Sequence, residues 1–144
     1  HPRLRESRDY VATNNISKEF VDESVFDWAR QTEDRFDSIF GVGVFATFGR
    51  KEFDRLMALI WRILNPGGIL VNVSWDGDYY TQKQYSEKLK YRFSGTEGPT
   101  PDELIDWVQD ANFRLLERRI LSTDPKTYKW DSIHVSAFRR ESRS

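Results

Sequence analysis

The sequence predicts an α/β fold whose mostly parallel sheet ends in an antiparallel hairpin. Three observations predict it. An amphipathic helix runs through a Pro-Gly-Gly turn into a β-branched strand over residues 53–74, and a second helix begins near residue 100. Two further strands then follow with no helix between them, which favours an antiparallel pair. Alternating strands and helices predict a sheet covered by helices on both faces.

The elements before residue 46 are short. Residues 3–15 permit a short amphipathic helix, residues 19–22 are predicted as a short strand, and residues 27–33 as a brief helical or loop connection. Residues 36–45 are rich in β-branched and aromatic side chains and contain Gly41 and Gly43. This pattern predicts a buried strand that runs into a tight loop.

The clearest helix has apolar residues every three or four positions, which form one stripe. These residues are Phe53, Leu56, Met57, Ile60, Ile63 and Leu64. Helix breakers follow at Asn65-Pro66-Gly67-Gly68, and residues 69–74 are predicted as an interior strand. The unit of helix, turn and strand is the strongest local signal in the sequence.

The last third of the chain begins with an excursion over residues 75–99 that has no sustained period. Thr100-Pro101-Asp102-Glu103 then combines an N-cap, a proline at the first position and a glutamate three residues after the cap. This pattern predicts a helix that closes near Ala111-Asn112. Strands are predicted over residues 113–121 and 132–138, the second with a clear alternation of apolar and polar residues.

Composition excludes several classes of protein. The chain has 144 residues, which indicates one domain, and 22 basic against 23 acidic residues give a net charge of -1. A dedicated nucleic-acid binder carries a basic surplus, so none is expected here. There is no cysteine for a disulfide or a thiolate metal site, and no apolar run approaches the ~20 residues that span a bilayer. We therefore expect no membrane partner and a cytoplasmic location.

Several segments, taken in order, resemble class I S-adenosylmethionine-dependent methyltransferases. Residues 36–45 resemble the fourth strand of that family, Leu64-Asn65-Pro66-Gly67-Gly68 its turn into the fifth strand, and residues 100–138 the final helix and hairpin. Residues 20–28 resemble its third strand and the loop beside the adenine ring. The resemblance covers residues 16–138. It implies a Rossmann-like fold, S-adenosylmethionine as cofactor and methyl transfer to a small-molecule or glycan-type acceptor.

The same resemblance implies the site residues. Cofactor contacts would come from Ser24, Val25 and Phe26 beside the adenine and from Gly41, Val42 and Gly43 beside the methyl donor; acceptor contacts would come from Phe45, Thr47, Trp75, Tyr79 and Tyr80. Each has a simpler interpretation. The glycines also fit a strand-end turn, and the aromatic residues a satellite core under a long loop.

Departures from the family pattern matter more than the matches. The glycine-rich loop after the first strand and the acidic residue after the second are not found, and the sequence opens on His1-Pro2. The resemblance thus implies a carboxyl-terminal part of such a domain, which lacks the first two strands. We expect weak cofactor binding by this chain alone, and a companion chain or N-terminal segment that covers the sheet edge left open.

The catalytic base is unassigned. Ser24 stands where many members have Asp, and Ala46-Thr47 where several have Glu-His. Thr47, Asp76 and His134 are candidates by elimination only, and His134 fits a partly buried, hydrogen-bonded residue better.

Two other functions stay open. One is a non-catalytic scaffold or partner-binding module with the same fold. The other is a nucleotide-sugar transferase in which Asp76 and Asp78 hold a divalent cation.

Overall fold

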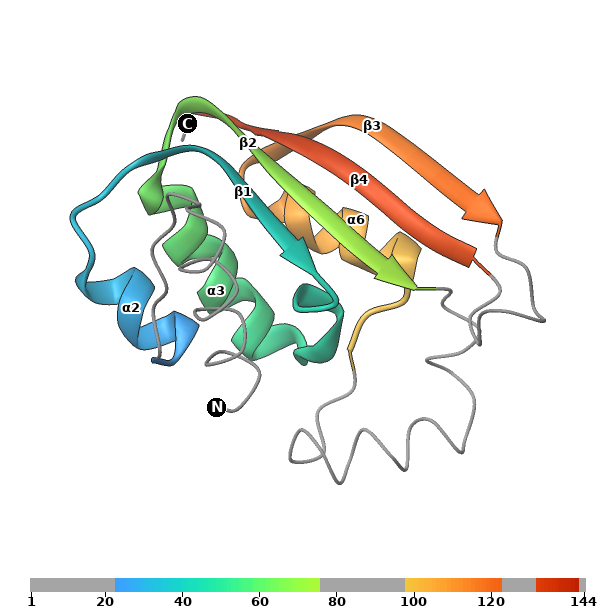
Figure 1. Cartoon of the computed structure of the whole chain (residues 1–144), viewed down its shortest axis with the longest axis horizontal. Coiled ribbons are helices and arrows are strands. Elements are labelled where there is room, and N and C mark those ends of the chain that lie inside the picture. The colour runs from blue at the N-terminus through green and yellow to red at the C-terminus, as the bar shows by residue number, and fades with distance from the viewer. Residues whose placement is uncertain (1–22, 76–97, 123–131, 143–144) are drawn as a thin grey trace, which may run out of the picture. The chain divides into compact units, whose positions relative to one another are not determined.

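The computed structural model describes residues 23–75, 98–122 and 132–142 (Figure 1). The chain divides into two compact units, residues 1–32 and 33–144, and each is described by itself. The predictions for residues 3–15 and 19–22 lie outside the described residues. In the first unit the described element is helix α2, Val25–Gln31, which begins two residues before the segment 27–33 predicted as helix or loop. The helix also takes in residues 25–28, which the resemblance placed in a strand and the loop after it.

The described residues of the second unit form a four-stranded sheet, two α-helices and one 3-10 turn. In chain order its elements are β1 (Phe36–Val42), η1 (Phe45–Thr47), α3 (Arg50–Ile63), β2 (Leu64–Trp75), α6 (Pro101–Asp110), β3 (Phe113–Ser122) and β4 (Ser132–Arg140). The strand order is β1-β2-β4-β3 (Figure 1). β1 and β2 are parallel, and β4 is antiparallel to both β2 and β3. Three strands therefore run in one direction, and the predicted fold class with its closing antiparallel pair is confirmed.

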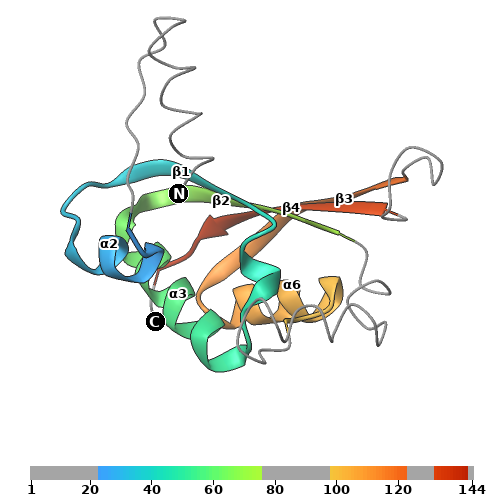
Figure 2. The ribbon, with the colours of Figure 1, turned by 60° about the horizontal axis from the view of Figure 1, so that its bottom comes forward.

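The two α-helices described in this unit, α3 and α6, lie on the same face of the sheet (Figure 2). α3 contacts β2, α6 contacts β3, and the two helices contact each other. The prediction of helices on both faces is not met by the described part of residues 33–144. The reason is the strand order: β1 to β2 and β2 to β3 both step in the same direction across the sheet, and right-handed crossovers in one direction place their helices on one side.

The core lies between this helix layer and the sheet. Its fully buried side chains include Phe53, Leu56, Met57 and Ile63 from α3, Leu104 and Val108 from α6, and Leu70 and Phe138 from the sheet. The apolar stripe predicted for residues 53–64 is thus the face that α3 buries. Phe53 meets Trp107 of α6 edge to face, with 5.2 Å between ring centroids, which joins the two helices.

The predicted start of β2 is wrong, and so is the predicted burial of β1. β2 begins at Leu64 rather than at residue 69, because Leu64 pairs with Phe36 before the Pro-Gly-Gly turn interrupts the register. Gly67 has a φ of 75°, which only glycine adopts easily, so the turn is an irregularity inside the strand. β1 ends at Val42 and runs into the predicted tight loop, because Gly43, with a φ of 66°, leaves the extended conformation. The strand was predicted to be buried, but it lies at the edge of the described sheet and only its Gly41 is buried.

The start of α6 confirms the predicted capping box. The Thr100 hydroxyl accepts from the Glu103 backbone N–H at 3.2 Å, and the Glu103 carboxylate accepts from the Thr100 N–H at 3.2 Å. Both bonds satisfy N–H groups that a helix start leaves without an internal partner.

Thr100→Ala is expected to lower the free energy of unfolding by about 1 kcal/mol, because the alanine cannot accept the Glu103 N–H. Urea unfolding followed by circular dichroism measures the loss. Thr100→Ser keeps the hydroxyl and is the matched control. Equal stability of the alanine and serine variants would contradict the capping role.

Candidate functional site

One part of the predicted site, Gly41–Gly43, lies where the parallel strands β1 and β2 run side by side toward their carboxyl ends. Beyond β1, the Gly43 N–H donates to the Val73 carbonyl at 2.8 Å, so the pairing of the two strands continues past Val42. Val42 is 60 % exposed, whereas Gly41 is buried. Carboxyl ends of parallel strands are where open α/β sheets place their ligands, so this edge is the candidate site.

Packing inside the fold requires a glycine at position 41. A Cβ on Gly41 would run into the ring of Phe45, which is itself only 3 % exposed. Gly43 is needed for its positive φ. Both glycines thus meet the requirement of a strand-end turn, and a contact of either with a cofactor stays a prediction. Phe45 is a core residue, and its predicted contact with the acceptor stays a prediction.

The turn η1, which follows Gly43, is closed by its own bonds. The Thr47 hydroxyl donates to the Val44 carbonyl at 2.6 Å, and the Thr47 N–H approaches the same oxygen at 3.2 Å. The Thr47 hydroxyl therefore stabilises the turn by closing it against the Val44 carbonyl. Its predicted contact with the acceptor stays a prediction.

The segment before α6 packs on η1 through Gly98. A Cβ on Gly98 would overlap the carbonyl oxygen of Ala46, which is 2 % exposed. α6 itself also contacts η1. The 3-10 turn is therefore held from two sides, by its own hydroxyl bond and by the backbone at Gly98.

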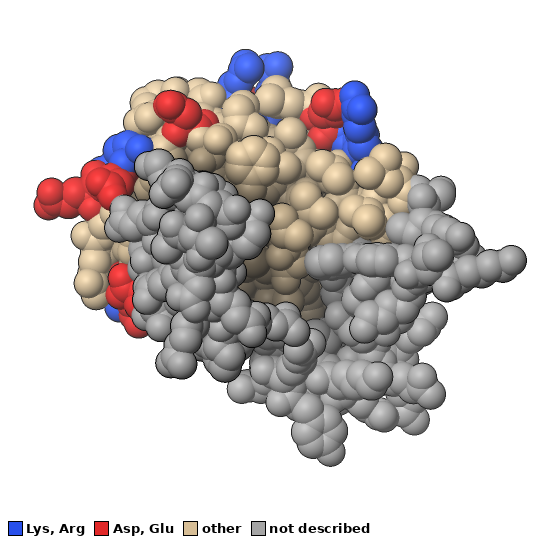
Figure 3. Space-filling view, in the orientation of Figure 1, with Lys and Arg blue, Asp and Glu red and all other residues tan. Residues whose placement is uncertain are grey.

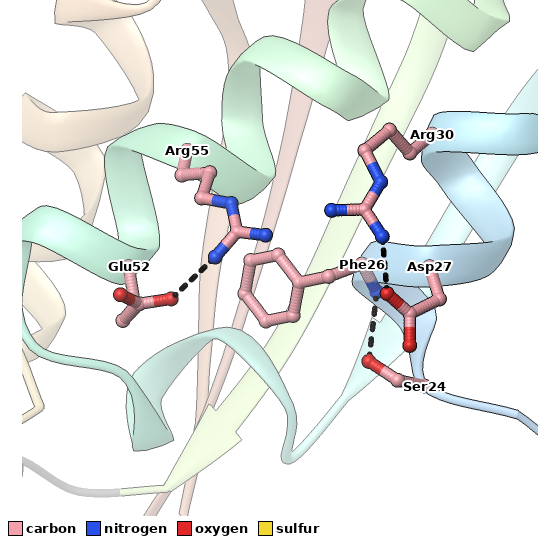
Figure 4. Close-up of polar contacts among 6 residues, drawn as sticks. All are labelled: Ser24, Phe26, Asp27, Arg30, Glu52 and Arg55. Atoms are coloured by element: carbon pink, nitrogen blue, oxygen red, sulfur yellow. Dashed lines mark hydrogen bonds and ion pairs between the residues drawn. The ribbon is translucent and has the colours of Figure 1, made fainter.

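The predicted adenine-side residues belong to α2 in the other unit. The Ser24 hydroxyl is the N-cap and accepts from the Phe26 N–H at 3.3 Å, and Arg30 donates to Asp27 at 2.5 Å (Figure 4). Val25 is 39 % exposed. Because Ser24, Val25 and Phe26 lie in a different unit from Gly41–Gly43, the two halves of the predicted cofactor site are described separately.

Several predicted residues lie at or beyond the limits of the described chain. Trp75 is the last residue of β2. Four of them lie outside the described residues: Asp76, Asp78, Tyr79 and Tyr80. The structure therefore does not test the hypothesis of a cation held by the two aspartates. His134 is half-buried, and its Nε2 lies 3.2 Å from the Ser132 hydroxyl.

Sequence reasoning missed a buried polar group in β2. Asn72 and Ser74 are each 2 % exposed, and Ser136 on β4 is 4 % exposed. The signal was the alternation of Asn72 and Ser74 with valines in a strand that otherwise predicts a fully apolar interior.

The electrostatic setting is mixed. On the face drawn in Figure 3 the described charged side chains lie at the margin, with both signs intermingled, and the described residues between them are uncharged. Within the described ranges, no three His, Cys, Asp or Glu residues gather as a metal site. No helix in the described part of the chain is long and apolar enough to cross a membrane.

No family model matches this sequence, and no curated protein matches it. Solved structures do match its fold. An O-methyltransferase family protein from Burkholderia thailandensis is 14% identical with a TM-score of 0.66; the match covers 96% of this chain and 41% of that one.

Two further structures match as well. The N-methyltransferase NodS from Bradyrhizobium japonicum, in complex with S-adenosylhomocysteine, is 14% identical with a TM-score of 0.64, over 92% of this chain and 60% of that one. The [4+2]-cyclase SpnF is 14% identical with a TM-score of 0.69, and the match covers 97% of this chain and 63% of that one. The chain thus spans less than two thirds of each of these three proteins. Strand order, helix placement and these matches together show that the chain has the fold of class I S-adenosylmethionine-dependent methyltransferases.

Proposed function

We propose that this chain is the carboxyl-terminal part of an S-adenosylmethionine-dependent methyltransferase that acts on a small-molecule or glycan-type acceptor. The observation that carries the proposal is the similarity, over 92% of the chain, to an N-methyltransferase solved with S-adenosylhomocysteine. The carboxyl ends of β1 and β2, where ligands of open α/β sheets bind, support it.

The residues at this edge fit such a cofactor in part. Val42 offers an exposed apolar side chain, and Gly43 offers a backbone without a side chain to obstruct a ligand. We propose that these two residues flank the cofactor, while Gly41 leaves room for the ring of Phe45. We also propose that Ser24, Val25 and Phe26 lie beside the adenine.

When bound, the cofactor supplies a methyl group on a sulfonium to a nucleophilic oxygen, nitrogen or carbon. The protein then contributes mainly by holding acceptor and donor in line. Thr47 does not serve as a base in this proposal, because a hydroxyl is a weak base and this one is bonded to Val44. Trp75, Tyr79 and Tyr80 are proposed to enclose the acceptor.

Calorimetric titration with S-adenosylhomocysteine tests the cofactor assignment. The 144-residue chain is expected to bind only weakly, because its sequence lacks the glycine-rich loop and the acidic residue that hold the cofactor in the family. Should the natural protein extend beyond these residues, or have a companion chain that supplies both features, that protein is expected to bind in the micromolar range. Micromolar binding by the 144 residues alone would contradict the first expectation, and no binding by the complemented protein would contradict the function.

A companion is also favoured by the exposed edge of the sheet. β1 is an edge strand of the described sheet, and its Phe40 and Val42 are 67% and 60% exposed. An apolar edge strand is prone to pair with another strand. We propose that such a strand, from a companion chain or a further segment of this protein, pairs with β1 and completes the cofactor site.

A second candidate is a protein of this fold that transfers no methyl group. The match to SpnF, a [4+2]-cyclase, favours it, because it shows the same fold attached to another function. Mass spectrometry of acceptor mixtures after incubation with S-adenosylmethionine separates the two candidates. Cofactor binding without any methylated product would favour the second.

A further inference from the structure

The helix-facing side of the sheet changes from apolar to polar along β2. Leu70 lies opposite Phe138, Asn72 opposite Ser136, and Ser74 opposite His134. Residues two apart in a strand share one face, so this row of side chains faces one way. Arg118, opposite Ser136, reaches Asp102 of α6 at 2.7 Å, which shows that the row faces the helix layer.

Asn72 is the exceptional member of the row. Its Nδ2 donates to the Ser74 hydroxyl at 3.3 Å, and its Oδ1, buried, has no hydrogen-bond partner among the described residues. Turning the amide over would let Oδ1 accept from the Ser74 hydroxyl and leave the NH₂ group without that bond. In either orientation, one end of this amide has no hydrogen-bond partner among the residues that the structure describes.

An unfilled buried amide is costly, and folded proteins rarely keep one. A leucine of nearly the same shape would avoid the cost, as Leu70 does two residues earlier. A polar group kept at a cost to stability is typical of binding sites.

We propose that Asn72, Ser74 and Ser136 form a binding position for a neutral hydroxyl group of a small ligand. A hydroxyl donates to the Asn72 oxygen and accepts from a serine hydroxyl, so it satisfies both kinds of group at once. A charged ammonium fits less well, because none of the three side chains is charged and Leu70 and Phe138 beside them are apolar. The inference rests on the proposed function only in naming this ligand as the methyl acceptor, which is then an alcohol or a phenol.

The test uses the ¹⁵N-labelled 144-residue chain and the side-chain amide signals of Asn72. Benzyl alcohol is the probe, and benzyl methyl ether is the matched probe that lacks the O–H donor. The alcohol is expected to shift the Asn72 signals and to bind about fivefold more tightly than the ether, the effect of one hydrogen bond. Equal binding of the two probes, or no shift at Asn72, would overturn the proposal.

Stability provides an independent measurement. Asn72→Leu is expected to abolish the preference for the alcohol and to raise Tm by about 3 °C, since it removes an unfilled buried group. Asn65→Leu is the matched control, because the Asn65 amide donates to Asp37 at 2.9 Å. That variant should lower Tm and leave alcohol binding unchanged.

A lower Tm for Asn72→Leu would mean that the amide is already satisfied by a buried water molecule, and would also overturn the proposal. The probes do not involve S-adenosylmethionine. Alcohol binding with no affinity for S-adenosylhomocysteine in the complemented protein would therefore contradict the proposed function and leave this site intact, and the reverse result would contradict this site alone.

Discussion

Phe53→Ala is expected to lower the free energy of unfolding by about 3–5 kcal/mol, the largest effect of any substitution considered for this chain. Phe53 is 0 % exposed and lies in the buried stripe of α3. Its ring meets Trp107 of α6 edge to face at 5.2 Å. Alanine would lose the burial of the ring, leave a cavity between the two helices, and remove the aromatic contact that joins them.

The ion pairs around this contact are a smaller contribution. Arg50 bonds Asp110 and Asp54, each at 3.0 Å, and its guanidinium carbon lies 5.0 Å from the centre of the Trp107 ring. The bond to Asp110, more than that to Asp54, raises the pKa of Arg50 above its ordinary value, although burial opposes the shift. An arginine loses its proton, and with it its charge, only as the pH rises through its pKa. Because that pKa is raised, Arg50 stays charged throughout the neutral range. Its side chain is 43% exposed, so water screens these pairs and their contribution is about 0–1 kcal/mol.

Urea unfolding of Phe53→Ala, with Lys51→Ala as the exposed control on the same helix, measures the difference. The control should change stability by less than about 0.5 kcal/mol. A loss below about 1 kcal/mol for Phe53→Ala would show that α3 is not packed against α6 and the sheet as described.

The sequence predicted those parts of the fold that depend on periodicity and local chemistry. The stripe from Phe53 to Ile63 predicted α3, and Thr100 with Glu103 predicted the start of α6. The one-sided helix layer was not predictable, because it depends on the order β1-β2-β4-β3, which no local pattern encodes. The exposure of β1 was not predictable either, because its place at the edge of the described sheet depends on the same strand order.

The candidate site was less predictable than the fold. The resemblance pointed to Gly41 and Thr47, and the structure gives each a role in packing or in closing η1. Asn72 carried no motif, since a single asparagine in an apolar strand becomes informative only when its burial and its partners are known. Side chains that bind through tertiary neighbours leave little trace in sequence spacing.

The second large effect is expected at Gly98, where Gly98→Ala should lower the free energy of unfolding by about 1–3 kcal/mol. The sign of this change in the free energy of unfolding is what tests the packing at Gly98. Replacing glycine by alanine at a compatible position stabilises a protein by about 0.4–1 kcal/mol, because the unfolded chain loses freedom. Gly98 is not among the described residues with positive φ, so backbone strain does not oppose alanine there. The expected loss comes from the overlap of the new Cβ with the Ala46 carbonyl oxygen.

This overlap cannot be relieved by rotating a side chain, because the obstructing atom belongs to the backbone of η1. The turn is fixed by the Thr47 bond to Val44 and by the buried ring of Phe45, so the segment before α6 would have to move away. Urea unfolding measures the loss, and shifted backbone amide signals of residues 45–47 would locate it. Gly67→Ala is the comparison: nothing lies within 4 Å of that Cβ, so only its φ of 75° opposes the change and residues 45–47 should be undisturbed. A stabilised Gly98→Ala would show that this segment does not close on η1, and the carboxyl edge of β1 would then be open from the side of α6.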